Sequence, residues 1–390
     1  MAQLLEKLEN HIVAIIRNGE HDQPKGRGIA FLRWLLRQLS RLYRVAVQVR
    51  LFLYGKGIFR HHALGCQVIS IGNLTVGGTG KTPVVEVFAR DLQKAGRRVA
   101  ILSRGYKKVV PPLPERLLEK LLFIERRRPP RVVSDGKTLL LDSAMSGDEP
   151  YMLASRLPEV AVLVDKNRVK SGRYAISKLG CDTLILDDGF QYMALRHRLE
   201  IMLVDKTNPF GNSYVLPRGI LREPVKNIRR ADVVFITKCN GTGTEALKQQ
   251  IRALNDRAEI IECMHSAKFL QNVYTAEQQP LDYLEGRRVT ALSGIAVPDG
   301  FEEELGKRGA EIVLARRFAD HHRYSQQEII DLINASKASD AEAIITTEKD
   351  AVRLPKIERW DVPIYFLRVQ IEIVSGTEDF DECISRICFK

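Results

Sequence analysis

Long apolar runs, paired cysteines and low-complexity tracts are missing from this chain of 390 residues. No uninterrupted apolar run reaches the roughly 18–20 residues that a membrane-spanning helix needs. The six cysteines are scattered and form no Cys-x-x-Cys pair, which argues against a zinc site and fits a reducing cytoplasm. Cys66 and Cys181 begin apolar strand-like runs, so we expect buried thiols at both positions.

Acidic residues are too few to balance the basic ones. Lys and Arg number 60 against 48 Asp and Glu, which gives a formal net charge of +12. This balance indicates an anionic partner: nucleic acid, an acidic membrane surface or a phosphorylated substrate. Aromatic and basic residues are not interleaved as they are on nucleic-acid-binding surfaces, so we expect no nucleic-acid partner.

The strongest chemical signal that is present is a glycine-rich turn, Gly-Gly-Thr-Gly-Lys-Thr at residues 77–82, between an apolar strand and a helix-forming stretch. Glycines let backbone N–H groups crowd around phosphate oxygens, and the start of a helix favours anions. Lys81 would reach the β- and γ-phosphates of a nucleotide, and Thr82 would place its hydroxyl on a magnesium ion. The strict pattern has glycine where this chain has Thr75. The predicted nucleotide-binding residues are Thr75, Val76, Gly77, Gly78, Thr79, Gly80, Lys81 and Thr82.

A long amphipathic helix is predicted from Gly28 to Tyr54. Its arginines share one face, its apolar residues collect on the opposite face, and Trp34 and Tyr43 lie at the margins. Two interpretations are open: the helix lies in a membrane interface, or it packs its apolar side on the protein and turns its arginines to water. The arginines are Arg33, Arg37, Arg41 and Arg44, and the apolar residues are Phe31, Leu35, Leu39, Leu42, Ala46, Val49 and Leu53.

Strand-like and helical patterns alternate through the rest of the chain, which predicts an α/β fold: a mostly parallel sheet sandwiched by helices, followed by a second, smaller α/β domain. The first series has predicted strands at 66–73, 98–103, 159–165, 181–187, 199–205 and 231–237, and helices at 81–95, 147–157, 166–179 and 243–255. The second series has strands at 287–293, 311–316, 341–346 and 362–368, and helices at 298–308 and 325–337.

We therefore predict three regions: an N-terminal amphipathic helical region (1–60), a nucleotide-binding domain (61–285) and a C-terminal α/β domain (286–390). A proline-rich, basic stretch at 107–131 interrupts the first α/β series. We interpret it as an insertion, with a short helix at 115–125.

Two acidic pairs are candidates for phosphoryl chemistry. Asp187 and Asp188 end an apolar strand, as the carboxylates that hold magnesium do in P-loop enzymes. Asp148 and Glu149 begin a predicted helix, where capping alone explains acidic residues. Adjacent carboxylates could also divide the work of proton acceptor and metal ligand.

Three further motifs carry groups suited to acid–base or phosphate chemistry. The Asp-His pair ending at His321 could tune an acid–base group, or could be a solvated loop. Arg104 and Arg222 lie in turns near strand ends, and an arginine fork binds phosphate oxygens in a bidentate manner. Surface arginines are common, so neither residue is decisive alone.

Taken together, these motifs resemble the tetraacyldisaccharide 4'-kinases, the lipid A 4'-kinases of Gram-negative bacteria. The matching segments are Gly72–Pro83, Ser103–Tyr106, Gly147–Pro150, Asp187–Gln191, Leu216–Pro224, Ser293–Ala296, Phe318–His321 and Thr347–Asp350. The resemblance implies a kinase that uses ATP and Mg²⁺ to phosphorylate the 4'-hydroxyl of a tetraacyldisaccharide 1-phosphate, the lipid A disaccharide precursor. It also implies a peripheral enzyme on the anionic inner-membrane surface, at its cytoplasmic face, and so favours the membrane interpretation of the N-terminal helix.

The resemblance also implies roles for single residues. Asp148 would accept the proton of the sugar hydroxyl with His321 paired to it, and Lys81 would neutralise the β- and γ-phosphates. The implied magnesium ligands are Thr82, Glu149, Asp187 and Asp188, and the implied substrate or phosphate contacts are Arg104, Tyr106, Gln191 and Arg222. Because His321 falls in the second predicted domain, we expect a cleft that closes to complete the site.

The sequence departs from the family pattern at two places, and one competing function is also consistent with it. Tyr192 stands where the family usually has histidine, and the insertion at 107–131 is an addition to the family pattern. The competing function is a soluble P-loop ATPase or GTPase switch of the partitioning or metallochaperone type. Many such proteins carry a lysine where this chain has Val76, and Cys239 replaces the acidic residue of a guanine-binding motif.

Overall fold

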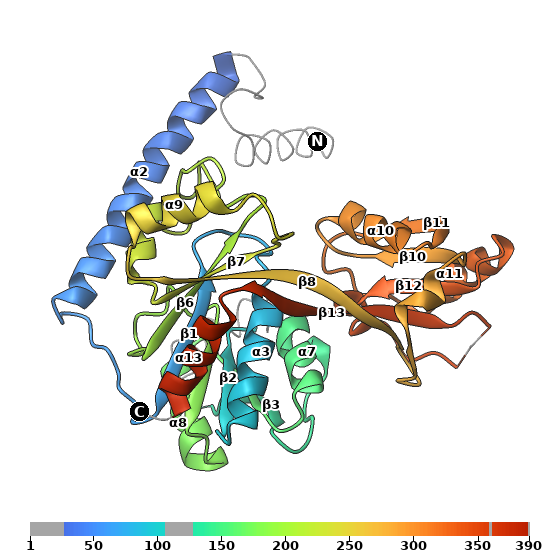
Figure 1. Ribbon diagram of the computed structural model, residues 1–390, viewed down its shortest axis with the longest axis horizontal. Helices are drawn as coiled ribbons and strands as arrows, with labels where there is room; N and C mark the ends of the chain where they lie inside the picture. The colour runs from blue at the N-terminus through green and yellow to red at the C-terminus, as the bar shows by residue number, and fades with distance from the viewer. Residues whose placement is uncertain (1–26, 106–127, 359–360, 389–390) are drawn as a thin grey trace. The chain divides into compact units, whose positions relative to one another are not determined.

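The computed structural model describes residues 27–105, 128–358 and 361–388, and the chain forms two compact units (Figure 1). The first unit comprises residues 1–104, 165–264 and 372–390, and the second comprises residues 105–164 and 265–371. These units do not follow the predicted boundaries at residues 60 and 285, because the chain leaves the first unit and returns to it. Most of the predicted insertion lies outside the described residues, and its last residue, Arg131, begins strand β3.

The first unit contains a parallel sheet whose strands follow the order β8-β7-β6-β1-β5-β2. Its strands are β1 (Gln67–Asn73), β2 (Val99–Ser103), β5 (Thr183–Asp187), β6 (Leu199–Asp205), β7 (Val233–Thr237) and the start of β8 (Glu259–Asn272). Its helices are α2 (Arg27–Gly55), α3 (Lys81–Lys94), α8 (Arg168–Leu179), the 3₁₀ helix η2 (Val225–Arg230), α9 (Glu245–Leu254) and α13 (Thr377–Cys388).

Successive side chains of β7 point to opposite faces of this sheet, and each face is covered by helices. Val234 and Ile236 join an apolar cluster with residues of α9. Phe235 points the other way, where its ring lies 5.7 Å from that of Phe88 on α3 and 6.3 Å from that of Phe380 on α13. A strand buried on both faces has no polar side, which is why the first series is a set of continuous apolar runs in the sequence.

The second unit contains a smaller parallel sheet, β11-β10-β12-β13, whose next neighbour is β8. Ile344 and Ile345 of β12 lie in separate apolar clusters, one with α11 and the other with α10, so helices cover both faces here too. The antiparallel pair β3–β4 and helix α7 belong to the same unit. These two α/β sheets confirm the predicted fold class.

The elements of the second unit have the following bounds. The strands are β3 (Arg131–Asp135), β4 (Ala161–Val164), β9 (Gln278–Gln279), β10 (Arg288–Ser293), β11 (Glu311–Arg317), β12 (Ala343–Thr347) and β13 (Ile364–Ser375), of which the last ends in the first unit. The helices are α6 (Ser143–Ser146), α7 (Asp148–Arg156), η3 (Leu281–Leu284), α10 (Pro298–Lys307), α11 (Gln326–Ala338) and α12 (Glu348–Ala351).

Helix α2 contacts the rest of the first unit through polar side chains and the half-buried Tyr43 ring, and it leaves an apolar stripe exposed. Ser40 donates to the carbonyl of Val215 over 2.8 Å, and Gln48 donates to Asn227 over 3.2 Å. The exposed apolar stripe comprises Phe31, Trp34, Leu35, Leu39, Leu42, Val45, Val49 and Phe52. Packing of the predicted apolar face on the protein is therefore the wrong interpretation. None of the described helices is long and apolar enough to cross a membrane.

Candidate functional site

The phosphate loop, residues 77–82, has the backbone that its glycines predict. Gly77 (φ 132°) and Gly80 (φ 77°) adopt the left-handed region that other residues rarely enter. The loop is braced from two sides: the N–H of Val76 donates to the carbonyl of Ile220 over 2.7 Å, and Thr237 donates its hydroxyl to the carbonyl of Thr79 over 3.0 Å. The segment 216–224 therefore supports the phosphate loop.

Thr75, the departure from the strict pattern, lies in extended chain, where glycine is not required. It forms a β-bridge with Leu221, and its buried hydroxyl accepts a hydrogen bond from the Asn73 amide over 3.2 Å. Asn73 also accepts from the ammonium of Lys81 over 3.3 Å. The sequence prediction missed Asn73, although its position at the end of β1 is the usual place for a ligand-binding residue.

Four predicted residues from three motifs meet beside the phosphate loop. The Lys81 ammonium lies 3.4 Å from Asp188, and the Arg222 guanidinium donates to both oxygens of Asp188 over 2.8 and 2.7 Å. Gln191 donates to the Asn73 carbonyl over 3.0 Å. Burial raises the pKa of Asp188, but the charges of Lys81 and Arg222 outweigh burial and hold it below its ordinary value. Asp188 is therefore an ionised carboxylate at neutral pH.

Asp187 lies on the other side of the same strand end, where it is buried and accepts a hydrogen bond from Ser103 over 3.0 Å. Arg168, which the sequence prediction missed, is also buried, and its guanidinium lies 4.9 Å from the centre of the Tyr192 ring. The Tyr192 hydroxyl accepts from the backbone N–H of Arg168 over 2.9 Å, so the residue that replaces the family's histidine helps to fix the start of α8. Arg104 is exposed.

The second unit holds the predicted acid–base pair. His321 Nδ1 lies 2.9 Å from Asp148 Oδ2, and Arg353 Nε donates to the same oxygen over 2.9 Å. Burial raises the pKa of Asp148, but the hydrogen bond from His321 and the charge of Arg353 outweigh burial, so the pKa lies below its ordinary value. An ionised carboxylate can only accept, so His321 Nδ1 carries the proton of this hydrogen bond.

The remaining predicted residues are placed as follows. Glu149 forms an ion pair with Lys349 over 3.2 Å in the second unit. Tyr106 lies outside the described residues. Asp148 and His321, assigned to different predicted domains, belong to one unit, whereas the phosphate loop, Asp187 and Asp188 belong to the other. Within the described residues there is no group of three or more His, Cys, Asp or Glu side chains that could hold a metal ion.

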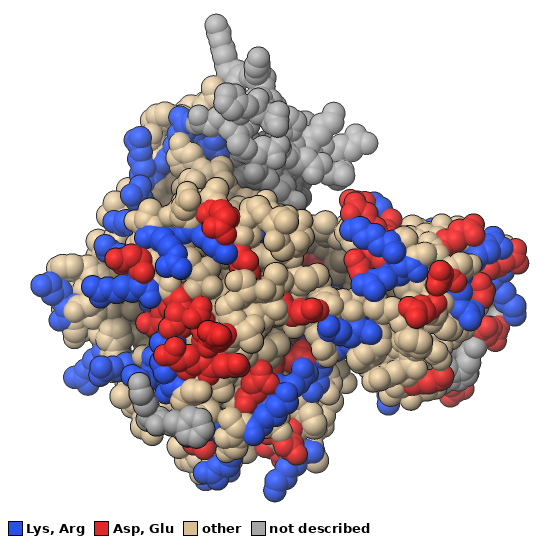
Figure 2. All heavy atoms as spheres, in the orientation of Figure 1, with Lys and Arg blue, Asp and Glu red and all other residues tan. Residues whose placement is uncertain are grey.

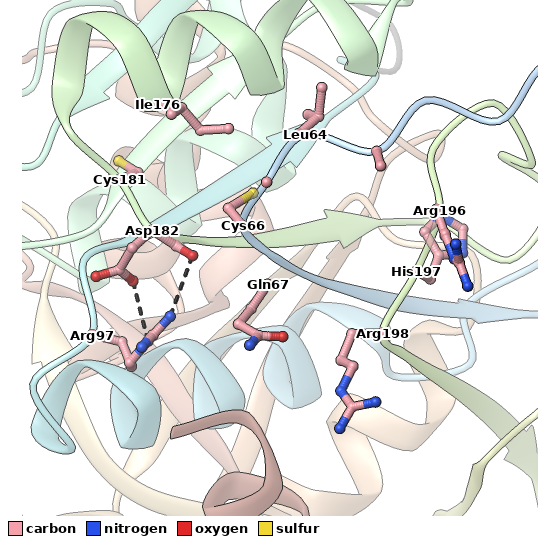
Figure 3. A pocket seen from close by; sticks show the side chains of 12 residues that line it. Leu64, Cys66, Gln67, Arg97, Ile176, Cys181, Asp182, Arg196, His197 and Arg198 are labelled. Atoms are coloured by element: carbon pink, nitrogen blue, oxygen red, sulfur yellow. Dashed lines mark hydrogen bonds and ion pairs between the residues drawn. The ribbon is translucent and has the colours of Figure 1, made fainter. Parts of the chain in front are cut away.

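A cavity of about 630 Å³ lies at the amino ends of β1, β5 and β6, whereas the phosphate loop follows the carboxyl end of β1 (Figure 3). Cys181 is buried there as predicted, whereas Cys66 is only half-buried, which corrects the prediction for that position. Burial raises the pKa of each thiol to about 11, so both stay protonated at neutral pH. Arg97, which also lines the cavity, pairs with Asp182 over 3.1 Å.

Comparison with known proteins gives one consistent family. A family model described as tetraacyldisaccharide-1-P 4'-kinase matches residues 32–388. The tetraacyldisaccharide 4'-kinase of Syntrophus aciditrophicus is 38% identical over 348 residues, which cover 87% of this chain and 89% of that protein. The same enzyme from Anaeromyxobacter dehalogenans is 43% identical over 315 residues, covering 80% of this chain and 79% of that protein. The crystal structure of LpxK from Aquifex aeolicus in complex with ATP matches with a TM-score of 0.71 and 30% identity, covering 92% of this chain and 100% of that chain.

Proposed function

Because the chain belongs to the tetraacyldisaccharide 4'-kinase family, we propose a role for each set of site residues in the reaction of that family. The protein is an ATP-dependent kinase that phosphorylates the 4'-position of the lipid A precursor. The switch-type ATPase or GTPase is not favoured. One observation supports this assignment of residues. Lys81 contacts Asp188, and Asp148 contacts His321, as expected for the nucleotide-binding and proton-accepting groups.

The phosphate loop binds the phosphates of ATP through its backbone N–H groups and the start of α3. Lys81 now shares Asp188 with Arg222. When ATP binds, Lys81 exchanges this carboxylate for the β- and γ-phosphates, and Arg222 continues to balance the charge of Asp188. The exchange keeps every charge paired, as buried charges require.

The residues also fit a magnesium ion. Thr82, at the start of α3, offers a hydroxyl, and Asp187 and Asp188 offer carboxylates, which are the hard oxygen ligands that Mg²⁺ prefers. Mg²⁺ keeps several of its waters, so few protein ligands suffice. When bound, the ion supplies positive charge that stabilises the transferring phosphoryl group.

Asp148 orients the 4'-hydroxyl and accepts its proton. Its Oδ2 receives two hydrogen bonds at 2.9 Å, from His321 and Arg353, while Oδ1 has a longer contact, 3.5 Å to Arg323. Oδ1 is therefore the oxygen that accepts from the sugar hydroxyl. The hydroxyl oxygen forms a bond to the γ-phosphorus, the bond from that phosphorus to the bridging oxygen of ADP breaks, and the proton passes to Asp148. Phosphoryl transfer has a loose transition state, so an acceptor with a low pKa is adequate.

The nucleotide-binding residues belong to the first unit, and Asp148 belongs to the second.

Helix α2 binds the anionic surface of the inner membrane, at its cytoplasmic face, where ATP is available. Its apolar stripe is exposed, and Arg41 and Arg44 are exposed on the same helix. Figure 2 shows basic side chains over α2, next to uncharged surface. A basic residue near an anionic surface contributes about 1 kcal/mol. A substrate with four acyl chains stays in the bilayer, so binding there brings the enzyme to it.

The test is transfer of the γ-phosphoryl of labelled ATP to detergent-solubilised tetraacyldisaccharide 1-phosphate. The wild-type protein should label the lipid, and Asp148→Ala should bind ATP with unchanged affinity and label the lipid at least about 100-fold more slowly. Hydrolysis of ATP without lipid labelling would support the switch instead. Wild-type rates in Asp148→Ala would remove Asp148 from the reaction.

A further inference from the structure

A buried arginine joins the acid–base pair to the rest of the second unit. The Arg353 side chain is fully buried, and its guanidinium binds three oxygen acceptors. Nε donates to Asp148 Oδ2 over 2.9 Å, and one terminal nitrogen donates to the carbonyl of Gly294 and to Asp350 Oδ1, each over 3.1 Å. The other terminal nitrogen lies 3.1 Å from His321 Nδ1, which donates its proton to Asp148 and therefore does not accept from Arg353.

The partner of Arg353 is itself held rigidly. The Asp350 side chain is fully buried, and its Oδ2 accepts from the N–H of Gly294 over 3.0 Å and from the Thr347 hydroxyl over 2.6 Å. Its Oδ1 accepts from the Tyr324 hydroxyl over 3.0 Å. A Cβ atom on residue 294 would lie 2.8 Å from the Tyr324 hydroxyl and 2.9 Å from Asp350 Oδ1, so only glycine fits.

These contacts suggest a structural role for two motifs, Ser293–Ala296 and Thr347–Asp350. The residues of these motifs have no direct role in the proposed reaction. Both motifs converge on Arg353 through Gly294 and Asp350. The backbone N–H of His321 also donates to the Gly294 carbonyl, over 3.1 Å. One guanidinium and one carboxylate thus tie the catalytic aspartate, the histidine and two sequence motifs into a single buried network.

We propose that Arg353 is a positioning residue for phosphoryl transfer: it fixes Asp148 Oδ2, the oxygen that also accepts from His321, so that Asp148 Oδ1 is directed at the sugar hydroxyl. This rests on the proposed role of Asp148 as proton acceptor. Arg353 does not touch the reacting atoms. A lysine could not replace it, because a single ammonium on a flexible stem cannot satisfy Asp148, Asp350 and the Gly294 carbonyl in one plane.

Arg353 also sets the charge around the acceptor. The charged or titratable groups that lie against Asp148 are His321, Arg323 and Arg353, and its neighbour Glu149 is paired with Lys349. Of the two arginines, Arg353 has the shorter contact and the fully buried side chain.

The test compares Arg353→Lys and Arg353→Gln with a matched control, Arg368→Lys. Arg368 is another buried arginine of the second unit, paired with Glu348 over 2.8 Å. The same chemical change there measures the general effect of loosening a buried ion pair. Each variant is checked for folding by circular dichroism, then assayed for kcat and for the KM for ATP, with detergent-solubilised disaccharide.

In Arg353→Lys, kcat should fall roughly 10- to 100-fold with the KM for ATP unchanged, since a misplacement of about 1 Å has that effect. Arg353→Gln should lose more. Arg368→Lys should stay within about twofold of wild type. Folded Arg353 variants with wild-type kcat would overturn the proposal, as would an equal loss in Arg368→Lys.

If Arg353→Gln does not fold, the kcat of Arg353→Lys, which retains the buried charge, tests the proposal without it. Failure of the proposed function has a different signature: wild-type protein without lipid labelling, or Asp148→Ala with full turnover.

Discussion

The apolar stripe of α2 gives a membrane-binding prediction whose size follows from side-chain exposure. Phe31, Leu42 and Phe52 are 64%, 67% and 58% exposed. Full burial of such a side chain contributes about 1.5–3 kcal/mol, so the exposed part of each is worth about 1–2 kcal/mol. Replacing all three by Ser should weaken binding to vesicles by about 3–6 kcal/mol, a factor of roughly 10² to 10⁴.

The assay is co-sedimentation with vesicles that contain phosphatidylglycerol. Val297 of the second unit is 64% exposed, so Val297→Ser controls for loss of an exposed apolar side chain elsewhere. Turnover of detergent-solubilised substrate should stay near wild type in the triple variant, because none of the three side chains belongs to the proposed site. Unchanged sedimentation of the triple variant, or an equal loss in Val297→Ser, would refute the reasoning.

Three further predictions concern the site. His321→Ala should keep the wild-type Kd for ATP, measured by calorimetry, and lose about 10²–10⁴-fold in kcat, the usual contribution of acid–base groups; unchanged turnover would exclude His321. Gly294→Ala should lose about 1–3 kcal/mol in urea unfolding and lower kcat, because its Cβ would meet Tyr324 and Asp350 within 3 Å; equal stability would contradict the packing. The pKa of Asp188 is lower in the folded state than in the unfolded state, so the ionised carboxylate stabilises the fold. This contribution to the free energy of unfolding is present above the unfolded-state pKa of about 3.9 and is lost as pH falls through the folded-state pKa. Asp188→Asn should therefore show a smaller drop in unfolding free energy between pH 7 and pH 3 than wild type, and an equal drop would refute this.

Strands and helices with strong local patterns could be predicted from the sequence, and those defined by distant partners could not. Strand β6 was predicted at 199–205 and observed at Leu199–Asp205. Strand β3 was missed, since it follows a basic, proline-rich stretch and forms only by antiparallel pairing with β4. Helix α13 was missed because its few apolar residues matter only on contact with α3, where Phe380 lies 4.9 Å from Phe88.

The same distinction holds for the site. The phosphate loop could be predicted because its chemistry lies in consecutive residues, and Asp187 and Asp188 because they end an apolar strand. The pairing of Asp148 with His321 spans 173 positions, and only the family resemblance suggested it. The contact of Arg353 with Asp148 spans 205 positions and belongs to no motif, so nothing local marked it. Cys66 and Cys181 both precede an apolar strand and line the same cavity, but only Cys181 is fully buried, so the local pattern could not separate them.

The most direct test of the central claim is the position of the new phosphate. Tetraacyldisaccharide 1-phosphate is incubated with ATP, Mg²⁺ and the protein, and the lipid is examined by phosphorus NMR and mass spectrometry. The account predicts a second phosphate monoester on the 4'-oxygen with the wild-type protein and none above background with Asp148→Ala. ADP release without a second phosphate on the lipid, or a phosphate on another oxygen, would contradict it.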